Sequence, residues 1–311
     1  LAHASSNANG GDGWNPREFG GIPSDFLGTV DGQGHTISGL YIDRTSDRIG
    51  LFSSVGQSTS ISGKPVVSNI HFEDVDIQSD GEQIGTVAGV VQLDATVENI
   101  SVGTGTITGG WAVGGVVGDV SGTVNHSYSQ ADVTGDWEIG GLIFSTNGGV
   151  IDNAYAVGTV TDTGSTSDDA GGLIGTGANN PSITNSHWTI EGTGRSTSAG
   201  TIGGTYIGLV DNSEIQGDEA LNTELDFTNV YETVEGSDSD ASGDGFPILQ
   251  ANDREDQLRS QNLFQSIQPS LELTNPSDNQ GYMWDQEEVN LSLNYTVEGT
   301  GEIQYTVNGQ V

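Results

Sequence analysis

The sequence predicts an all-β protein, with a right-handed parallel β-helix followed by part of an immunoglobulin-like β-sandwich. Three observations predict it: a repeat of about 30 residues, a glycine-rich composition, and strict alternation of apolar and polar residues near the C-terminus. Glycine supplies 48 of the 311 residues, about twice the usual share of roughly 7%. Because hydrophobic residues make up only 33% of the chain, we expect a thin, repetitive core of small side chains.

Two columns of residues define the repeat. In the first, an apolar residue, small residues and an apolar pair recur at Val87–Val91, Val113–Val117, Ile139–Ile143 and Ala170–Ile174, with a shorter copy at Ile49–Phe52. In the second, an apolar residue precedes Asn by two places, at Val67/Asn69, Val97/Asn99, Ile151/Asn153 and Ile183/Asn185, with Val124/His126 as the exception. Successive copies of this second column lie 30, 27, 27 and 32 residues apart.

One period is too short for a βαβ unit with a full helix, and it is rich in Gly, Val, Ile, Thr and Ser, which are typical of strands and turns. We therefore interpret one period as one coil of the β-helix, with three short strands and the next coil stacked about 4.8 Å away. Glycine pairs in the first column would let neighbouring backbones approach closely. The Asn column predicts a turn whose side chains hydrogen-bond from coil to coil.

Several of these segments resemble a known family. Gly114–Gly118 and Gly171–Gly175 resemble the GLUG motif, and Phe26–Leu40 resembles the segment that commonly precedes GLUG repeats. Asn185–Trp188 and Gly245–Leu249 resemble the ends of such arrays. The resemblance covers roughly residues 14–250. It implies a parallel β-helix from a large secreted or cell-surface protein of bacteria or archaea, many of which are adhesin-like.

The patterns divide the chain into a β-helix with an N-terminal cap over 1–250, a polar connector without glycine over 251–268, and a different region over 269–311. In the last region, three strands are expected around Leu271–Leu273, Val289–Val297 and Ile303–Val307. An immunoglobulin-like sandwich takes about 100 residues and seven strands, so we expect this domain to be incomplete here. Either the polypeptide continues past Val311, or a neighbouring molecule supplies a strand.

The chain is strongly acidic, with 43 Asp and Glu against 7 Lys and Arg and a formal net charge of −36. This charge excludes a nucleic-acid-binding surface. The acids occur in every segment, which is typical of a halophile, because molar salt shortens the Debye length to about 3 Å and screens their repulsion. An acidic protein with a basic partner is the alternative. The chain lacks an apolar run of about 18 residues, so we expect no membrane insertion within it.

No catalytic residue is predicted, because the five histidines are dispersed without metal-binding spacing and no zinc-protease, Walker or nucleophile-elbow pattern occurs. The absence of cysteine also excludes disulfides and thiolate chemistry. Asp238, Asp240 and Asp244 alternate with small residues before a glycine turn, a pattern that can direct several oxygens at calcium. The alternative is an ordinary acidic surface loop. Calcium is thus the one cofactor that the sequence suggests.

Four sequons mark candidate glycosylation sites: Asn99, Asn125, Asn290 and Asn294. Asn99 belongs to the Asn column, where hydrogen bonds would occupy its side chain. Asn125 lies one place before that column, and Asn290 and Asn294 fall on the polar face of an expected strand. We therefore favour these three over Asn99.

Five aromatic residues of the repeat region could line a sugar-binding face: Trp111, Trp137, Tyr128, Tyr155 and Trp188. The alternative, which we favour, is that they cap or pad the solenoid. The sequence as a whole predicts a secreted, cell-surface module with a structural or adhesive role, no catalysis, and other copies of itself or surface polysaccharide as partners. The alternatives are a subunit of an extracellular filament and a carbohydrate-active enzyme, for which a pair of carboxylates would suffice.

Overall fold

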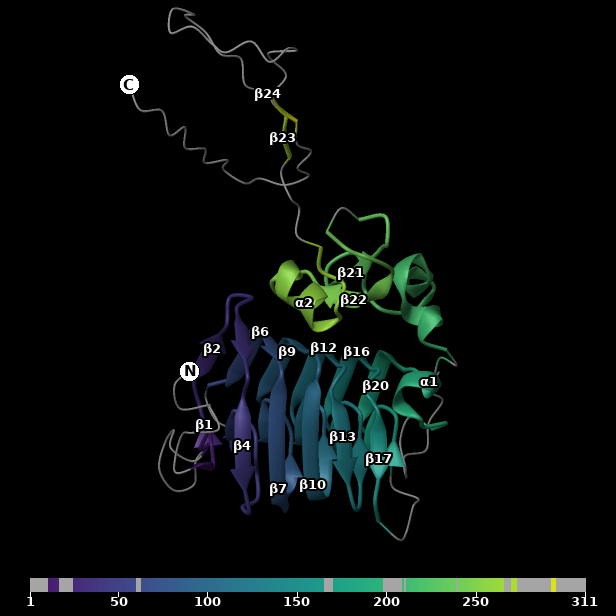
Figure 1. Ribbon diagram of the computed structural model, residues 1–311. Helices are drawn as coiled ribbons and strands as arrows, with labels where there is room; N and C mark the ends of the chain where they lie inside the picture. Colours follow the sequence, from purple (N-terminus) through teal and green to yellow (C-terminus); the bar gives the residue numbers. More distant parts are fainter. Residues whose placement is uncertain are drawn as a thin grey trace, which may run out of the picture. The chain divides into compact units, whose positions relative to one another are not determined.

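The computed structural model describes residues 11–16, 25–59, 63–164, 170–197, 209, 211–238 and 240–265, together with the backbone of 270–272 and 292–294. It divides into two compact units, Leu1–Gln265 and Ser266–Val311. The first unit is built on a parallel β-solenoid of about five turns (Figure 1). This confirms the solenoid that the repeat predicts.

Three parallel sheets form the walls of the solenoid, and each coil passes through them in turn. The first sheet contains β1 (Asp25–Phe26), β5 (Phe52–Val55), β8 (Ala88–Val91), β11 (Val117–Val120), β15 (Ile143–Asn147) and β19 (Ile174–Ala178). The second contains β2 (Thr29–Asp31), β3 (Thr36–Ser38), β6 (Val66–Glu73), β9 (Thr96–Val102), β12 (Thr123–Ser129), β16 (Val150–Ala156) and β20 (Ser182–Trp188). The third contains β4 (Tyr41–Arg44), β7 (Val75–Ile84), β10 (Gly105–Gly114), β13 (Asp132–Gly135), β14 (Ile139–Gly140), β17 (Val160–Asp162) and β18 (Ala170–Gly171).

The register of the second sheet follows the period read from the sequence. Each apolar residue of the second column pairs with its equivalent in the next coil, in the order Val67, Val97, Val124, Ile151 and Ile183. The column also extends one coil towards the N-terminus, because Val30 pairs with Val67. The sequence pattern did not mark this earlier member.

The first column needs a correction of three residues in one coil. Ile84 pairs with Val113 and Ala88 pairs with Val117, so the equivalent of Val113–Val117 is Ile84–Ala88 and not Val87–Val91. The apolar run around Val87 offers several matches to the same pattern, and only strand pairing selects one of them. The glycine pairs behave as expected, since a Cβ at Gly140 would meet the backbone oxygen of Ile143.

The Asn column lies inside the strands of the second sheet and not at a turn, contrary to the sequence prediction. Its members have a left-handed backbone, with φ between 46° and 57°, at Asn69, Asn99, His126, Asn153 and Asn185. Asn tolerates this conformation better than most residues do. The left-handed residue shifts the alternation of the strand by one place. In β9, Val97, Ile100 and Val102 therefore all enter the core in the lumen.

A second layer packs on the outer face of the second sheet; we call residues 211–265 the flanking layer (Figure 1). The helix α1 (Ile190–Thr193) ends the solenoid, and the flanking layer contains η2 (Asn212–Ile215), η3 (Gly217–Asn222), β21 (Tyr231–Val234), β22 (Gly245–Leu249) and α2 (Arg254–Ser260). Where the sequence predicts a connector over 251–268, α2 instead buries Gln257 and Leu258 completely. The pattern missed it because this segment is polar on average.

In the second unit, β23 (Ser270–Glu272) pairs antiparallel with β24 (Ser292–Asn294). Leu271 and Leu293 are partners in this pair. The strand expected at Ile303–Val307 lies outside the described residues. The immunoglobulin-like sandwich remains a prediction.

Candidate functional site

One column of outward-facing residues in the second sheet holds the flanking layer. These residues lie two places after the Asn column, and all are 0–2% exposed: His71, Ser101, Tyr128, Tyr155 and His187. In an open solenoid this column would face water. Its burial shows that the second sheet has a core on both sides.

The amide of Gln257 links the two layers through several hydrogen bonds. Its Oε1 accepts from the Tyr128 hydroxyl at 3.1 Å and from the Leu249 N–H at 2.8 Å. Its Nε2 donates to the carbonyls of Leu249 and Asn252 at 3.0 and 3.3 Å. Because the side chain is fully buried, these bonds satisfy an amide that would otherwise be costly to bury.

His71 makes a second link. Its Nδ1 lies 2.9 Å from the Ser101 hydroxyl, and its Nε2 lies 2.8 Å from the hydroxyl of Ser260 at the end of α2. Burial lowers the pKa of His71 to about 4, although the nearby carboxylates of Asp256 and Asp253 oppose this shift. The imidazole is therefore neutral at physiological pH and acts as a buried hydrogen-bonding group.

Tyrosines fill the apolar part of this junction. The rings of Tyr128 and Tyr155 are stacked with centroids 4.8 Å apart, and Tyr231 of the flanking layer lies 5.8 Å from Tyr155. Burial raises the pKa of all three phenols. Tyr128 and Tyr155 thus pad the solenoid, as the favoured sequence interpretation has it, and cannot contact a sugar.

The tryptophans in the same prediction divide between surface and interior. Trp188 is 3% exposed, whereas Trp111 and Trp137 are 46% and 42% exposed. The last two come from adjacent coils, and their rings are tilted by 30° with centroids 5.6 Å apart. They form an exposed aromatic pair on the third sheet, where β13 ends and β14 begins beside β10.

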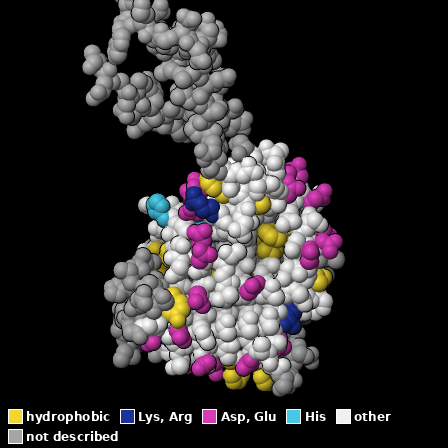
Figure 2. Space-filling view, viewed as in Figure 1, with side chains coloured by type: hydrophobic (Ala, Val, Ile, Leu, Met, Phe, Trp, Pro, Cys, Tyr) yellow, Lys and Arg dark blue, Asp and Glu magenta, His cyan; other side chains and the backbone are white. Residues whose placement is uncertain are grey.

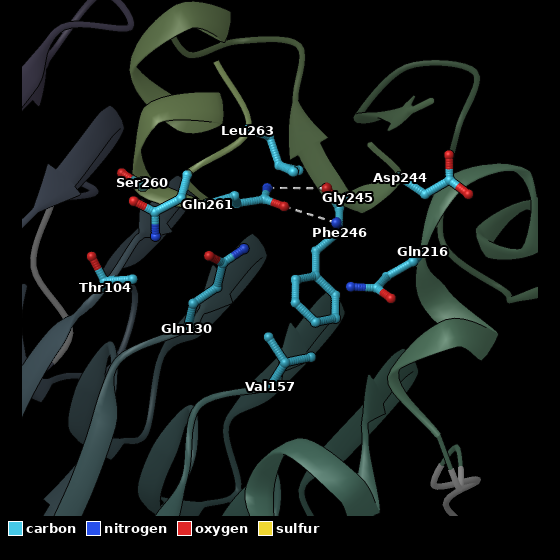
Figure 3. Close-up of a pocket in the computed structure, with 11 residues that line it drawn as sticks. Thr104, Gln130, Val157, Gln216, Asp244, Gly245, Phe246, Ser260, Gln261 and Leu263 are labelled. Carbon is cyan, nitrogen blue, oxygen red and sulfur yellow. Dashed lines mark hydrogen bonds between the residues drawn. The ribbon is translucent and has the colours of Figure 1, made fainter. Parts of the chain in front are cut away.

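A pocket of about 260 Å³ opens where the flanking layer meets the corner between the second and third sheets (Figure 3). Thr104, Gln130 and Val157 line it from the solenoid. Ser129 pairs with Ala156 of the next coil. Gln130 and Val157 directly follow these two residues, so they occupy equivalent positions in successive coils. The flanking layer contributes Gln216, Asp244, Gly245, Phe246, Ser260, Gln261, Asn262 and Leu263.

Hydrogen bonds hold the pocket's residues in place. Gln261 accepts from the Phe246 N–H at 2.8 Å and donates to the Phe246 carbonyl at 3.1 Å. In Figure 3, the Phe246 ring lies between the amides of Gln130 and Gln216. Asp244 accepts from the Gly236 N–H at 2.7 Å through Oδ1. The site thus joins an aromatic ring, amides and one carboxylate around an open cavity.

Two of the three residues predicted to bind calcium, Asp238 and Asp240, hold a guanidinium, whereas Asp244 lines the pocket. Arg254 of α2 pairs with Asp238 at 2.8 Å, with Asp240 at 2.9 Å and with Glu232 at 2.7 Å. The hydrogen bond from Arg254 lowers the pKa of Asp240. Within the described residues, no group of three His, Asp or Glu side chains is arranged to hold a metal ion. The sequence missed Arg254 because it lies 14 residues beyond Asp240.

The structure places the sequons differently. Asn99 donates from Nδ2 to Asn69 Oδ1 at 2.9 Å, so its side chain is occupied as expected. Asn125 pairs with Glu98 and Asp152 on the two neighbouring strands of the second sheet, and it is partly exposed. Glycosylation at Asn125 stays a prediction. The side chains of Asn290 and Asn294 lie outside the described residues.

Acidic side chains are scattered over the visible face of the first unit, and few basic ones accompany them (Figure 2). None of the helices that the structure describes combines the length and the apolar character needed to cross a membrane.

Comparison with known proteins finds one informative similarity. A stretch of 175 residues, 55% of this chain, is 39% identical to part of halomucin from Haloquadratum walsbyi (strain DSM 16790 / HBSQ001). The chain covers 2% of halomucin's length. No protein-family model matches the chain, and no solved structure matches it. The chain is thus similar to a small segment of a very large protein from a halophilic archaeon.

Proposed function

We propose that the chain is a module of an extracellular, cell-surface protein of a halophile, with a structural or adhesive role and no catalytic activity. The similarity to halomucin carries this proposal. The formal net charge of −36 supports it, because such a charge is compatible with a compact fold where molar salt screens it. Membership of the GLUG family is part of the same proposal, because it rests on the motif resemblance alone and no family model matches the chain.

The solenoid suits a structural role. Its coils pair in parallel from β2 to β20 along the second sheet, so each coil is supported by its neighbours. The flanking layer adds a second core against the same sheet. This arrangement is a stiff spacer that presents its outer surface to surrounding molecules.

The pocket favours binding over glycoside hydrolysis. Hydrolases of this kind use two carboxyl groups about 5 to 10 Å apart. Among the residues that line the described pocket, Asp244 is the one carboxylate. Polymerisation into a filament stays a prediction.

The location is tested by labelling cells of the source halophile with antibodies raised against residues 25–265. Intact and permeabilised cells should label equally if the module lies outside the cell. Labelling only after permeabilisation would refute the proposal. Catalysis is tested separately, by incubating the chain with neutral and acidic polysaccharides in molar NaCl. New reducing or unsaturated ends that disappear on a carboxylate substitution would show an enzyme.

A further inference from the structure

We propose that the pocket between the solenoid and the flanking layer binds one neutral pyranose unit of a glycan. This inference concerns the isolated chain and does not depend on the role proposed above. It rests on the size of the pocket, the chemistry of its lining, its charge and its rigidity.

The size of the pocket restricts the ligand to a small molecule. Pockets for drug-sized ligands measure about 300–1,000 Å³, and this one measures about 260 Å³. It is open to solvent, because Thr104, Asp244 and Asn262 on its rim are exposed. One sugar ring could therefore enter while the rest of a glycan remains outside.

The lining offers partners suited to sugar hydroxyls. An amide presents two donors and an acceptor with two lone pairs, whereas each hydroxyl both donates and accepts. Gln130 and Gln216 place such amides on opposite sides of the Phe246 ring (Figure 3). The ring and Val157 supply an apolar wall against which the C–H face of a pyranose can pack. The Asp244 carboxylate adds an acceptor.

The charge of the pocket excludes an anionic ligand. Its described lining contains one carboxylate and no Lys or Arg, so a uronate or phosphate would meet repulsion without compensation. A metal ion is disfavoured for the opposite reason, since one carboxylate is too few for a hard cation. A neutral ligand also suits molar salt, because screening weakens long-range attraction of a charged ligand and leaves neutral hydrogen bonds largely unaffected. A uronate in contact with Asp244 would still be repelled, because the contact distance is close to the Debye length of about 3 Å.

The site is preorganised before any ligand binds. Gln261 fixes the backbone of Phe246 through two hydrogen bonds, and Gly236 fixes Asp244. The solenoid and the flanking layer also pack closely next to the pocket, since a Cβ at Gly103 would meet the Ser260 side chain. Such rigidity lowers the entropic cost of binding.

Binding is tested by titration calorimetry and ligand-observed NMR in molar NaCl, with methyl glycosides of neutral hexoses and N-acetylhexosamines as probes. Free hexoses and a disaccharide are titrated in parallel, to distinguish a site for one unit of a glycan from a site for a free sugar. We expect a Kd on the order of 1 mM for a methyl glycoside, retained in the disaccharide. Methyl glycosides of uronic acids should bind at least tenfold more weakly.

Two variants locate the site. Gln216→Ala removes one amide and should weaken binding tenfold or more, and Thr104→Trp should abolish it by filling the pocket from its exposed rim. Gln78→Ala is the matched control, because Gln78 is an exposed glutamine on β7 of the third sheet. It should leave the Kd unchanged. Circular dichroism and melting curves establish that each variant is folded.

Three results would overturn the assignment of the pocket to a neutral sugar, and a fourth would refute its assignment to a glycan unit. The first is no saturable binding of any neutral glycoside by the folded chain. The second is binding that Gln216→Ala and Thr104→Trp leave unchanged. The third is equal affinity for neutral and uronic glycosides. Binding of free hexoses without binding of the methyl glycosides would refute the assignment to a glycan unit.

Discussion

Replacing Gln257 by Ala should make the flanking layer open more easily without destabilising the solenoid. The substitution removes the acceptor of the Tyr128 hydroxyl and of the Leu249 N–H. The Leu249 carbonyl keeps a second donor, the Asn252 N–H at 3.2 Å. A buried polar group without a partner costs about 1–3 kcal/mol. Two such groups, together with the cavity that the lost side chain leaves, should destabilise the layer by about 3–5 kcal/mol.

The effect should be local, because the two parts of the molecule have different cores. The lumen core consists of residues such as Val97, Val124 and Ile151. The core under the flanking layer combines Tyr128 and Tyr155 with residues such as Tyr231. Since every 1.4 kcal/mol is a factor of ten, opening of the flanking layer should become a hundredfold or more easier.

Hydrogen exchange followed by mass spectrometry in molar NaCl measures this effect. Peptides that cover β21 and β22 should exchange at least a hundredfold faster in Gln257→Ala, and those that cover β11 and β15 should not change. Gln265→Ala is the control, because Gln265 is an exposed glutamine of the same layer. Unchanged exchange in β21 and β22, or equal acceleration in the solenoid, would refute this reasoning.

Three further predictions follow from charges and from the Asn column. The melting temperature should rise steeply between about 0.1 and 3 M NaCl as the repulsion is screened, and a flat curve would contradict the halophile interpretation. The pKa of His71 is about 4 in the folded chain, against an ordinary value of 6.5. Between these pH values the unfolded chain therefore binds more protons than the folded chain. Stability present above about pH 6.5 should therefore fall by about 3 kcal/mol as the pH approaches 4, and urea titrations of His71→Asn should lack most of this dependence. Asn99→Val should cost about 1–3 kcal/mol in urea unfolding, because Val is strained at φ 53°; Asn99→Gly, which is free of that strain, should cost less.

The sequence by itself determined the solenoid, because parallel in-register stacking repeats the same environment once per coil. A residue type that suits one coil therefore suits the next, and the repeat becomes visible in the chain. Val97 and its partners Val67 and Val124 show this directly. The Asn column was also visible, although its left-handed backbone within a strand was not. Asn is favoured both in turns and at left-handed positions outside turns, so its recurrence alone does not distinguish the two.

Tertiary structure alone decided what covers the second sheet. Tyr128 and Tyr155 recur like other outward residues, so the sequence left open whether they meet water, a sugar or protein. The flanking layer covers both rings, and it bonds to them from far along the chain: Gln257 lies 129 residues beyond Tyr128, and Pro247 lies 92 residues beyond Tyr155. The pocket has the same origin, because Gln130 and Phe246 belong to segments that no local pattern connects. Periodicity reports contacts between neighbouring coils, whereas contacts with a non-repeating layer leave no periodic trace in the chain.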